Sequence, residues 1–270
     1  AISDSGLVFI TAGLGGGTGT GASPVIAKIA KEIGALVLGV VTIPFQVERA
    51  RLVKAKEGLT RLVEVCDAVI VIDNNRLRKV AGNLPLTEAF GVANELIATF
   101  IKNLSETIAV PSLVNLDFAD LKAIMTGSGI CAIGVGEGQG DTKVEDAVER
   151  ALNTQLLDIG ELSKCEGALV HIEGGDDMTL EDVTRAGEIV VSRIAPNARV
   201  SWGARVNSKM QGAMKATVVL AGVDSPFLVR GLEPFGVLKR QTSEEGEEVN
   251  VVEKTEKNEG RKGFFGRMLG

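Results

Sequence analysis

The chain has 270 residues, of which 45 % are hydrophobic and 24 % charged, as in ordinary globular proteins. Its formal net charge of −6 argues against a general nucleic-acid binder, which needs a basic surface to displace counterions. The three cysteines, Cys66, Cys131 and Cys165, lie far apart in no metal-ligand pattern, which favours small buried side chains in a reducing cytoplasm.

The first elements alternate between strands and helices. The apolar run Leu7–Ala12 predicts a buried strand, Gly13–Gly21 a glycine-rich loop, and Ala22–Ile33 a helix. Leu36–Ile43 and Ala68–Asp73 are near-continuous apolar runs, typical of parallel strands covered on both faces, and the residues between them have helical spacing. We therefore expect a parallel sheet with right-handed crossovers.

A long helix is predicted between Pro85 and Pro111, because apolar residues recur there at three- and four-residue spacing. About 20 residues would span roughly 30 Å, the depth of a domain, so this helix is a candidate for a central helix between two domains. The following residues alternate again, with strands expected at 129–135, 168–173, 199–204 and 216–221, and helices at 118–125, 144–156 and 179–194.

Three parts are expected: residues 1–111 with the glycine-rich loop and the long helix, a second α/β domain at 112–226, and a charged linker with a terminal peptide at 227–270. The linker is too polar to bury a core. Its end turns apolar again beside basic residues, which predicts a short amphipathic helix that binds a membrane-tethered adaptor protein. Direct contact with an anionic membrane and a terminus without function are the alternatives. The apolar residues of this peptide are Phe264, Phe265, Met268 and Leu269.

The glycine-rich loop is the strongest chemical signal. It stands between a strand and a helix, so its N–H groups and the positive helix end can converge on phosphate, with Thr18 and Thr20 as hydroxyl donors. A turn that merely permits close packing is the alternative. A Walker A loop would need a lysine where Ala22 stands, and a dinucleotide site would need an acidic residue where Thr42-Ile43-Pro44 stands. Both common phosphate motifs are therefore weak.

The run GGGTGTG at 15–21 resembles the signature of the FtsZ family of tubulin-like cell-division GTPases. Four further segments are similar to that family in the same order: TIPFQVE at 42–48 followed by Arg51, Asn74, AFGVAN at 89–94, and NLDFAD at 115–120. The resemblance implies a tubulin/FtsZ-like α/β fold, with a parallel-sheet nucleotide-binding domain joined by the central helix to a smaller α/β domain. Since this chain opens almost directly on the glycine loop, we expect the N-terminal part of the first domain to be missing.

The resemblance also implies GTP and Mg²⁺ as ligands, without dedicated metal-ligating side chains. Phe90 and Asn94, four residues apart, share one helical face, where a ring can stack on a purine and an amide can pair with its edge. The family pattern Glu-Gly-x-x-Arg reads here as Glu48-Arg49-Ala50-Arg51, which leaves open whether Arg51 or Arg49 faces the nucleotide. The expected binding residues are Gly15, Gly16, Gly17, Thr18, Gly19, Thr20, Glu48, Arg51, Asn74, Phe90 and Asn94.

Asp117 and Asp120 are the candidate catalytic residues, and the resemblance adds Asn115 from the same loop. Paired carboxylates can orient a water for attack on phosphorus, although Asp117 could equally cap the helix that follows. The central helix would hold them roughly 30 Å from the glycine loop of their own chain. Only a head-to-tail neighbour could then bring the two together, and such a contact builds a filament.

The expected function is therefore a GTP-dependent, self-assembling filament that organises the division site as a cytoplasmic ring and hydrolyses GTP between subunits. One alternative is a tubulin-like regulator that binds nucleotide without polymerising. Another, an NAD-type dehydrogenase, fails on the missing acidic residue. The lone His171 lies in a strand-like stretch and is expected to be structural. The choice between main division protein and paralogue stays open.

Overall fold

The computed structural model describes residues 2–109, 117–153 and 162–228, and residues 1–230 form one compact unit. The domain boundary expected near residue 111 therefore lies outside the described residues, as does the terminal peptide with Phe264, Phe265, Met268 and Leu269. No helix among the described residues is long and apolar enough to cross a membrane.

The first half of the unit carries the elements that precede residue 110. They are β1 (Leu7–Gly13), α1 (Thr18–Glu32), β2 (Leu36–Ile43), α2 (Arg49–Val65), β3 (Ala68–Asp73), α3 (Asn74–Ala81) and α4 (Leu86–Ala109). The three strands and the long helix α4 are confirmed. Helix α3 is not predicted by apolar spacing, because most of its eight residues are polar.

Helix α1 begins at Thr18, four residues before the predicted start at Ala22. The Gly21 N–H already donates to the Gly17 carbonyl at 3.0 Å, so helical hydrogen bonding starts inside the glycine run. The prediction was wrong because glycine is a poor helix former, and a local hydrogen bond between Thr20 and Gly15, described below, offsets that propensity.

The second half of the unit follows the order expected from the sequence. Its main elements are α5 (Phe118–Met125), β4 (Gly129–Gln139), α6 (Lys143–Leu152), β5 (Gly167–Gly174), α7 (Leu180–Val191), β6 (Arg199–Val206) and β7 (Ala213–Ala221). Strand β4 runs four residues beyond its predicted end, because alternating glycines hide the strand pattern there. Helix α6 ends at Leu152, four residues before its predicted end.

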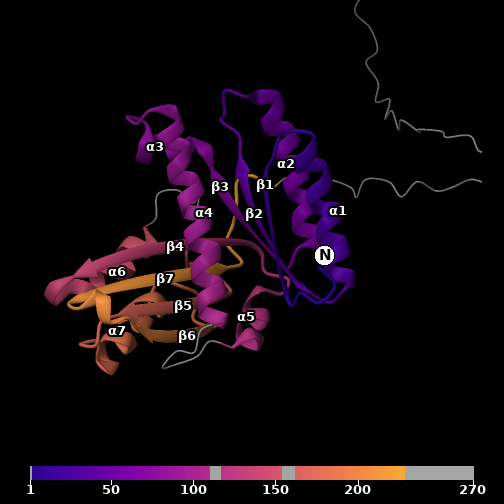
Figure 1. Ribbon diagram of the computed structural model, residues 1–270. Helices are drawn as coiled ribbons and strands as arrows, with labels where there is room; N and C mark the ends of the chain where they lie inside the picture. Colours follow the sequence, from indigo (N-terminus) through magenta and orange to yellow (C-terminus); the bar gives the residue numbers. More distant parts are fainter. Residues whose placement is uncertain (1, 110–116, 154–161, 229–270) are drawn as a thin grey trace, which may run out of the picture. The chain divides into compact units, whose positions relative to one another are not determined.

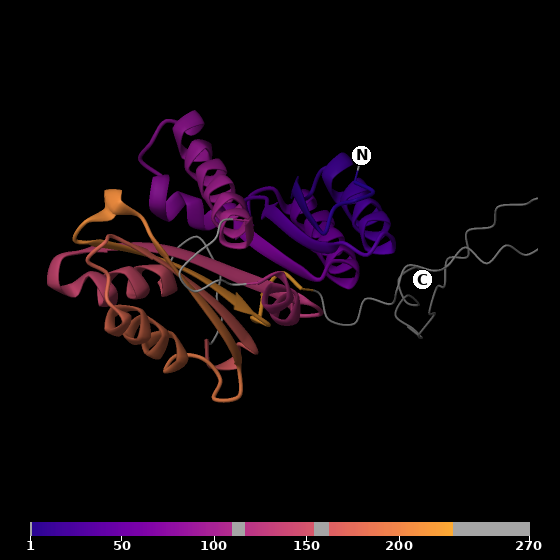
Figure 2. The same cartoon turned by 60° about the horizontal axis from the view of Figure 1, so that its bottom comes forward.

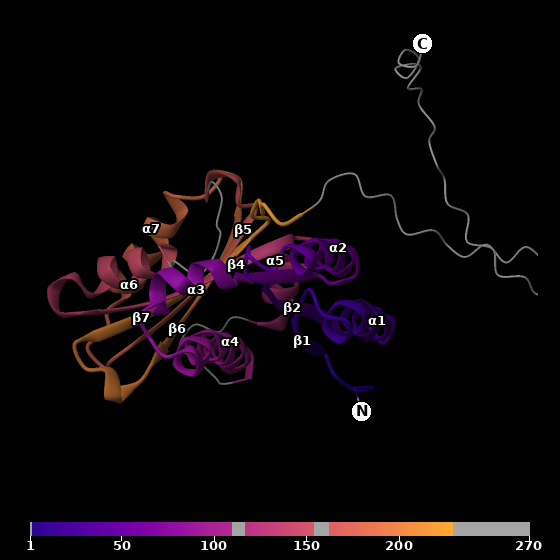
Figure 3. The same cartoon turned by 90° about the horizontal axis from the view of Figure 1, so that it is seen from above.

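A single seven-stranded sheet joins these elements within the described residues, in the order β1-β2-β3-β4-β7-β5-β6. Strands β1 to β4 are parallel, as are β5 and β6, whereas β7 is antiparallel to both of its neighbours (Figure 1). Viewed from above, α1 and α2 cover one face of β1–β3, and α6 and α7 cover one face of the second half (Figure 3). The fold is thus α/β with a mostly parallel sheet.

Two features hold the halves together. Strand β4 pairs with β3 over only three residues, from Ala68↔Gly129 to Ile70↔Cys131, but with β7 over nine. Helix α4 bridges this short seam (Figure 2). Its Phe100 ring meets Phe9 of β1 edge to face at 5.9 Å, and its Glu106 pairs with Arg205 of β6 at 3.2 Å. The long helix therefore packs on both halves, as a central helix should.

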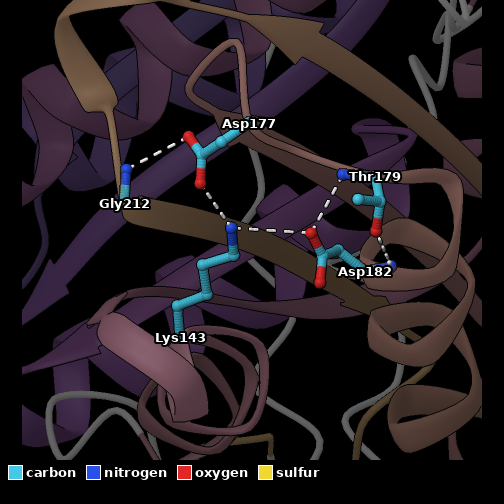
Figure 4. Close-up of polar contacts among 5 residues, drawn as sticks. All are labelled: Lys143, Asp177, Thr179, Asp182 and Gly212. Carbon is cyan, nitrogen blue, oxygen red and sulfur yellow. Dashed lines mark hydrogen bonds and ion pairs between the residues drawn. The ribbon is translucent and has the colours of Figure 1, made fainter.

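A polar cluster ties three loops of the second half at the end of β5 (Figure 4). Lys143 Nζ lies 2.8 Å from Asp177 and 3.5 Å from Asp182, and its side chain is only 13 % exposed. Asp177 also accepts the Gly212 N–H at 3.1 Å. Asp182 completes a capping box with Thr179 at the start of α7. Every charge in the cluster has a partner, so its role is structural.

Glycine at position 136 should be essential to the packing of α6 on β4. A Cβ built there would lie 2.1 Å from the Ala147 carbonyl oxygen and 2.5 Å from the Ala151 nitrogen, both on the helix backbone. We expect Gly136→Ala to lower the free energy of unfolding by about 1–3 kcal/mol in urea titrations. Gly187→Ala on α7, where nothing lies within 4 Å, is the control and should be neutral or stabilising. Equal effects of the two substitutions would contradict this packing.

The Lys143–Asp177 pair predicts a pH dependence. The hydrogen bond from Lys143 lowers the pKa of Asp177 below its ordinary value, and the same bond raises the pKa of Lys143. A depressed carboxyl pKa stabilises the fold above about pH 4 and loses that contribution as pH falls through the folded value. The loss in unfolding free energy on Asp177→Asn should therefore be constant from pH 5 to 8 and shrink below about pH 4. A pH-independent loss down to pH 3 would contradict the pairing.

Candidate functional site

The candidate binding residues gather at the carboxyl ends of β1, β2 and β3. These parallel strands end at the same edge of the sheet, the usual place for ligands in α/β folds. The glycine loop follows β1, the segment 44–48 follows β2, and Asn74 follows β3. The amino-terminal part of α4 completes the edge with Phe90 and Asn94.

The glycine loop has the form of an anion cradle. Gly15 has φ +96°, and a Cβ there would lie 2.8 Å from the Arg51 carbonyl oxygen, so only glycine fits. A Cβ at Gly16 or Gly17 would meet nothing within 4 Å, and both residues are exposed. No side chain caps the first turn of α1 and no acidic residue stands in it. The positive helix end therefore faces open space over the loop.

Thr18, Gly19 and Thr20 lie in the first turn of α1 rather than in the loop. Thr20 Oγ1 accepts the Gly15 N–H at 2.9 Å, so this hydroxyl fixes the loop from within. Thr18 is exposed beside the open loop backbone. Of the two predicted hydroxyl donors, Thr18 is therefore the one that the loop geometry leaves open to a ligand.

The segment after β2 is held by its own glutamate. Glu48 accepts the Phe45 N–H at 3.1 Å through Oε1 and the Arg51 guanidinium at 2.8 Å through Oε2. Arg51 also lies against Gly15 through its backbone, so it links this segment to the glycine loop. Arg49 is the exposed first residue of α2 and has no side-chain partner among the described residues. Arg51 is thus linked to Glu48 and to the glycine loop, which favours it over Arg49 as the residue near a ligand.

The end of β3 carries contacts that the sequence did not indicate. Asn74 opens α3 and is half-buried. Its neighbour Asn75 accepts the Gln46 N–H at 2.9 Å, and Asp73 accepts both the N–H and the side-chain amide of Asn75, at 2.8 and 2.7 Å. The pattern Asp-Asn-Asn could have signalled a helix cap, because Asp is a preferred cap residue.

Helix α4 brings an aromatic ring to the same edge. The rings of Phe90 and Phe45 lie 6.2 Å apart at an interplanar angle of 68°, and Phe90 remains 38 % exposed. Asn94 lies one helical turn further along and is exposed. The structure therefore brings the glycine loop, the segment 44–48, the end of β3 and the start of α4 together through direct contacts.

The candidate catalytic carboxylates lie elsewhere. Asp117 caps α5 by accepting the Asp120 N–H at 2.7 Å, which confirms the capping alternative without excluding a second role. Asp117 is exposed and Asp120 is half-buried, while Asn115 lies outside the described residues. The adjacent Phe118 is in van der Waals range of Gly6, with its Cζ 3.9 Å from a Cβ built there.

Gly6 precedes β1 and the glycine loop follows it, so the strand itself separates the two sites. Seven residues at about 3.3 Å each place them roughly 20 Å apart. This distance is shorter than the 30 Å expected from the length of α4. The two sites lie at the two ends of β1, so the length of that strand sets their separation. The carboxylates nevertheless lie at the pole opposite to the loop, with α5 at the lower end of the unit and α3 at the upper end in Figure 1.

Other titratable groups of the described residues offer no second site. Burial raises the pKa of Cys66 to about 12 and that of Cys131 to about 11, so both thiols are unreactive at neutral pH. His171 is buried on β5, its Nδ1 has no hydrogen-bond partner, and burial lowers its pKa. No group of three potential metal ligands gathers in the described part of the chain.

Comparisons with known proteins cover both halves. Residues 1–82 match the model "Tubulin/FtsZ family, GTPase domain", and residues 129–224 match "FtsZ family, C-terminal domain". The cell division protein FtsZ 2 of Methanocaldococcus jannaschii is 48 % identical over 246 residues, which cover 89 % of this chain. They cover 64 % of that relative, so the chain spans less than two thirds of its length.

Solved structures give the same result. An empty FtsZ dimer from M. jannaschii superimposes with a TM-score of 0.77 at 42 % identity, covering 87 % of this chain and 71 % of that one. CetZ2 from Haloferax volcanii, solved as a protofilament bound to GTPγS, has a TM-score of 0.68 at 25 % identity, covering 82 % and 66 %. On sequence and fold together, the chain belongs to the FtsZ family of tubulin-like proteins.

Proposed function

We propose that the full-length protein binds GTP, assembles head to tail into filaments, and hydrolyses GTP at the junction between consecutive subunits. The observation that carries this proposal is the placement of two half-sites at opposite ends of β1. One end has an open loop fit to hold phosphate but no carboxylate from α5, and the other has the carboxylates of Asp117 and Asp120 but no such loop. A second copy supplies what each end lacks.

The binding half-site assigns distinct tasks to its residues. The backbone of Gly16 and Gly17, with Thr18 and the start of α1, would hold the phosphates by N–H groups and helix dipole. Glu48 and Arg51, which are linked to each other and to the loop, would contact the ribose. Phe90 would stack on the base, with Asn94 pairing to its edge and Asn74 nearby.

Mg²⁺ fits a site of this kind. This ion is usually held through substrate phosphates and one or two protein oxygens rather than by a protein cage, and the described residues contain no such cage. When bound, the ion would offset the charge on the phosphate oxygens. The protein side of that arrangement is the loop backbone, which fixes where the phosphates lie.

The catalytic half-site would act on the neighbouring subunit. With α5 of one copy over the glycine loop of the next, Asp117 and Asp120, together with Asn115, orient the attacking water. Asp117 caps α5 through Oδ1, which fixes the direction of the carboxylate. Its Oδ2 would then accept a hydrogen bond from the attacking water. Because the contact joins two different surfaces, it repeats without closing and generates a filament. The CetZ2 protofilament with bound GTPγS is a relative's precedent.

The cellular role proposed for these filaments is to organise the division site as a cytoplasmic ring, in line with the names of the curated relatives. The terminal residues Phe264, Phe265, Met268 and Leu269 would bind a membrane-tethering adaptor protein. A peptide so short binds a bilayer weakly on its own, which favours a protein groove as its target.

Replacement of Asp120 tests the shared active site. In the full-length protein, Asp120→Ala should leave GTP affinity within about twofold of the wild type, since α5 is far from the loop of its own chain. Turnover in polymers should fall about 100-fold, the usual effect of losing a water-orienting group. The measurements are nucleotide binding by fluorescence and phosphate release at saturating GTP.

Asp146→Ala is the matched control, because Asp146 is a half-buried acid in the first turn of α6 and, like Asp120, stands near a helix start. This substitution should leave turnover unchanged. Normal turnover of Asp120→Ala polymers would refute the role in trans. A wild-type protein that binds GTP but shows no GTP-dependent rise in light scattering would instead favour a regulator that does not polymerise.

A further inference from the structure

Two side chains at the end of β3 form a polar clamp on the segment that follows β2. Asp73 is the last residue of β3 and is only 6 % exposed, and Asn75 is the second residue of α3. We call these two residues the Asp73–Asn75 clamp. They bind each other and the backbone of Gln46, which lies 29 residues earlier in the chain.

The clamp works through three hydrogen bonds in series. Asp73 Oδ1 accepts the Asn75 backbone N–H at 2.8 Å and the Asn75 side-chain Nδ2 at 2.7 Å. These two bonds fix the plane of the Asn75 amide, and its Oδ1 then accepts the Gln46 N–H at 2.9 Å. The direction of the last bond is therefore set by the first two, and each residue depends on the other.

Gln46 lies in the chain between Phe45 and Glu48, which contact two different parts of the binding half-site. On one side, Phe45 places its ring beside Phe90 and donates its N–H to Glu48. On the other side, Glu48 holds Arg51, whose backbone packs on Gly15 of the glycine loop. A shift of Gln46 would move both the stacking ring and the residues that border the loop.

We infer that Asp73 and Asn75 are positioning residues, which hold the segment 44–48 in the conformation that binds the guanine nucleotide. The inference rests on the proposed GTP-binding function and adds to it two residues that act through the segment 44–48. The clamp acts before chemistry, so its loss should weaken nucleotide binding without slowing the step that follows binding. The role of Asp73 in the clamp is to accept hydrogen bonds, and its charge is not needed. An asparagine at position 73 should therefore serve as well, since Asn and Asp are equally good helix caps.

The experiment uses the full-length protein and measures steady-state GTP hydrolysis together with equilibrium GTP binding. Asn75→Ala should raise KM and the dissociation constant for GTP about tenfold, while kcat at saturating GTP stays within about twofold. Asp73→Ala should give the same rise. The double variant should be no worse than either single variant, because the two residues act in series. Asp73→Asn should bind GTP like the wild type.

Asn207→Ala is the matched control. Asn207 also caps a short turn through its Oδ1, with Lys209 N–H at 3.2 Å, and donates its amide to Glu173 at 2.8 Å, but it follows β6 in the second half. This variant should leave KM unchanged. A merely structural clamp would lower the melting temperature and the active fraction of enzyme, and hence kcat, without raising KM.

Two results would overturn the inference. One is an Asn75→Ala variant that binds GTP as tightly as the wild type, and the other is a rise in KM that is additive in the double variant. Failure of the underlying function has a different signature, since the wild type itself would then neither bind nor hydrolyse GTP. The two failures are therefore distinguished within one set of measurements.

Discussion

Strand β1 is the constraint on which the rest of the structure depends. Its carboxyl end runs into the cradle of Gly15–Thr20, and its amino end is preceded by Gly6, which is contacted by Phe118 beside Asp117. A strand in a packed sheet does not shorten, so the roughly 20 Å between the two ends is fixed. Neither end can reach the other within one chain, and this separation is the reason for proposing that a second copy supplies what each end lacks.

The remaining architecture keeps these two ends in a fixed relation. A sheet joined by only three paired residues between β3 and β4 would bend at that seam if nothing spanned it. Helix α4 spans it, with Phe90 at the binding edge, Phe100 on β1, and Glu106 on β6. The same helix thus carries the ring proposed to stack on the base and also braces the second half, with α5, against β1.

Most of the strands and helices could be predicted from the sequence. An apolar run such as Leu36–Ile43 indicates a strand buried on both faces, and the apolar spacing in α4 indicates a helix buried on one face. What could not be predicted are contacts between segments far apart in the chain. The hold on Gln46 is such a contact, because it depends on Asn75 from another strand end. The early start of α1 was missed for a local reason, since glycine is a poor helix former and the Thr20–Gly15 hydrogen bond offsets it. The family motif singled out Asn74 and not its neighbour Asn75, because a sequence pattern gives residue types and not the directions of side chains.

Complementation between two inactive variants tests the central claim most directly. Gly17→Asp places a carboxylate in open space where phosphates would bind and retains a good cap for α1, while Asp120→Ala removes the catalytic carboxylate. Alone, each full-length variant should hydrolyse GTP at about 1 % of the wild-type rate or less. Mixed, they form junctions in which Asp120 of one faces the GTP of the other, so the mixture should regain a measurable share of wild-type turnover. A mixture that is no more active than its two components would contradict an active site shared between subunits.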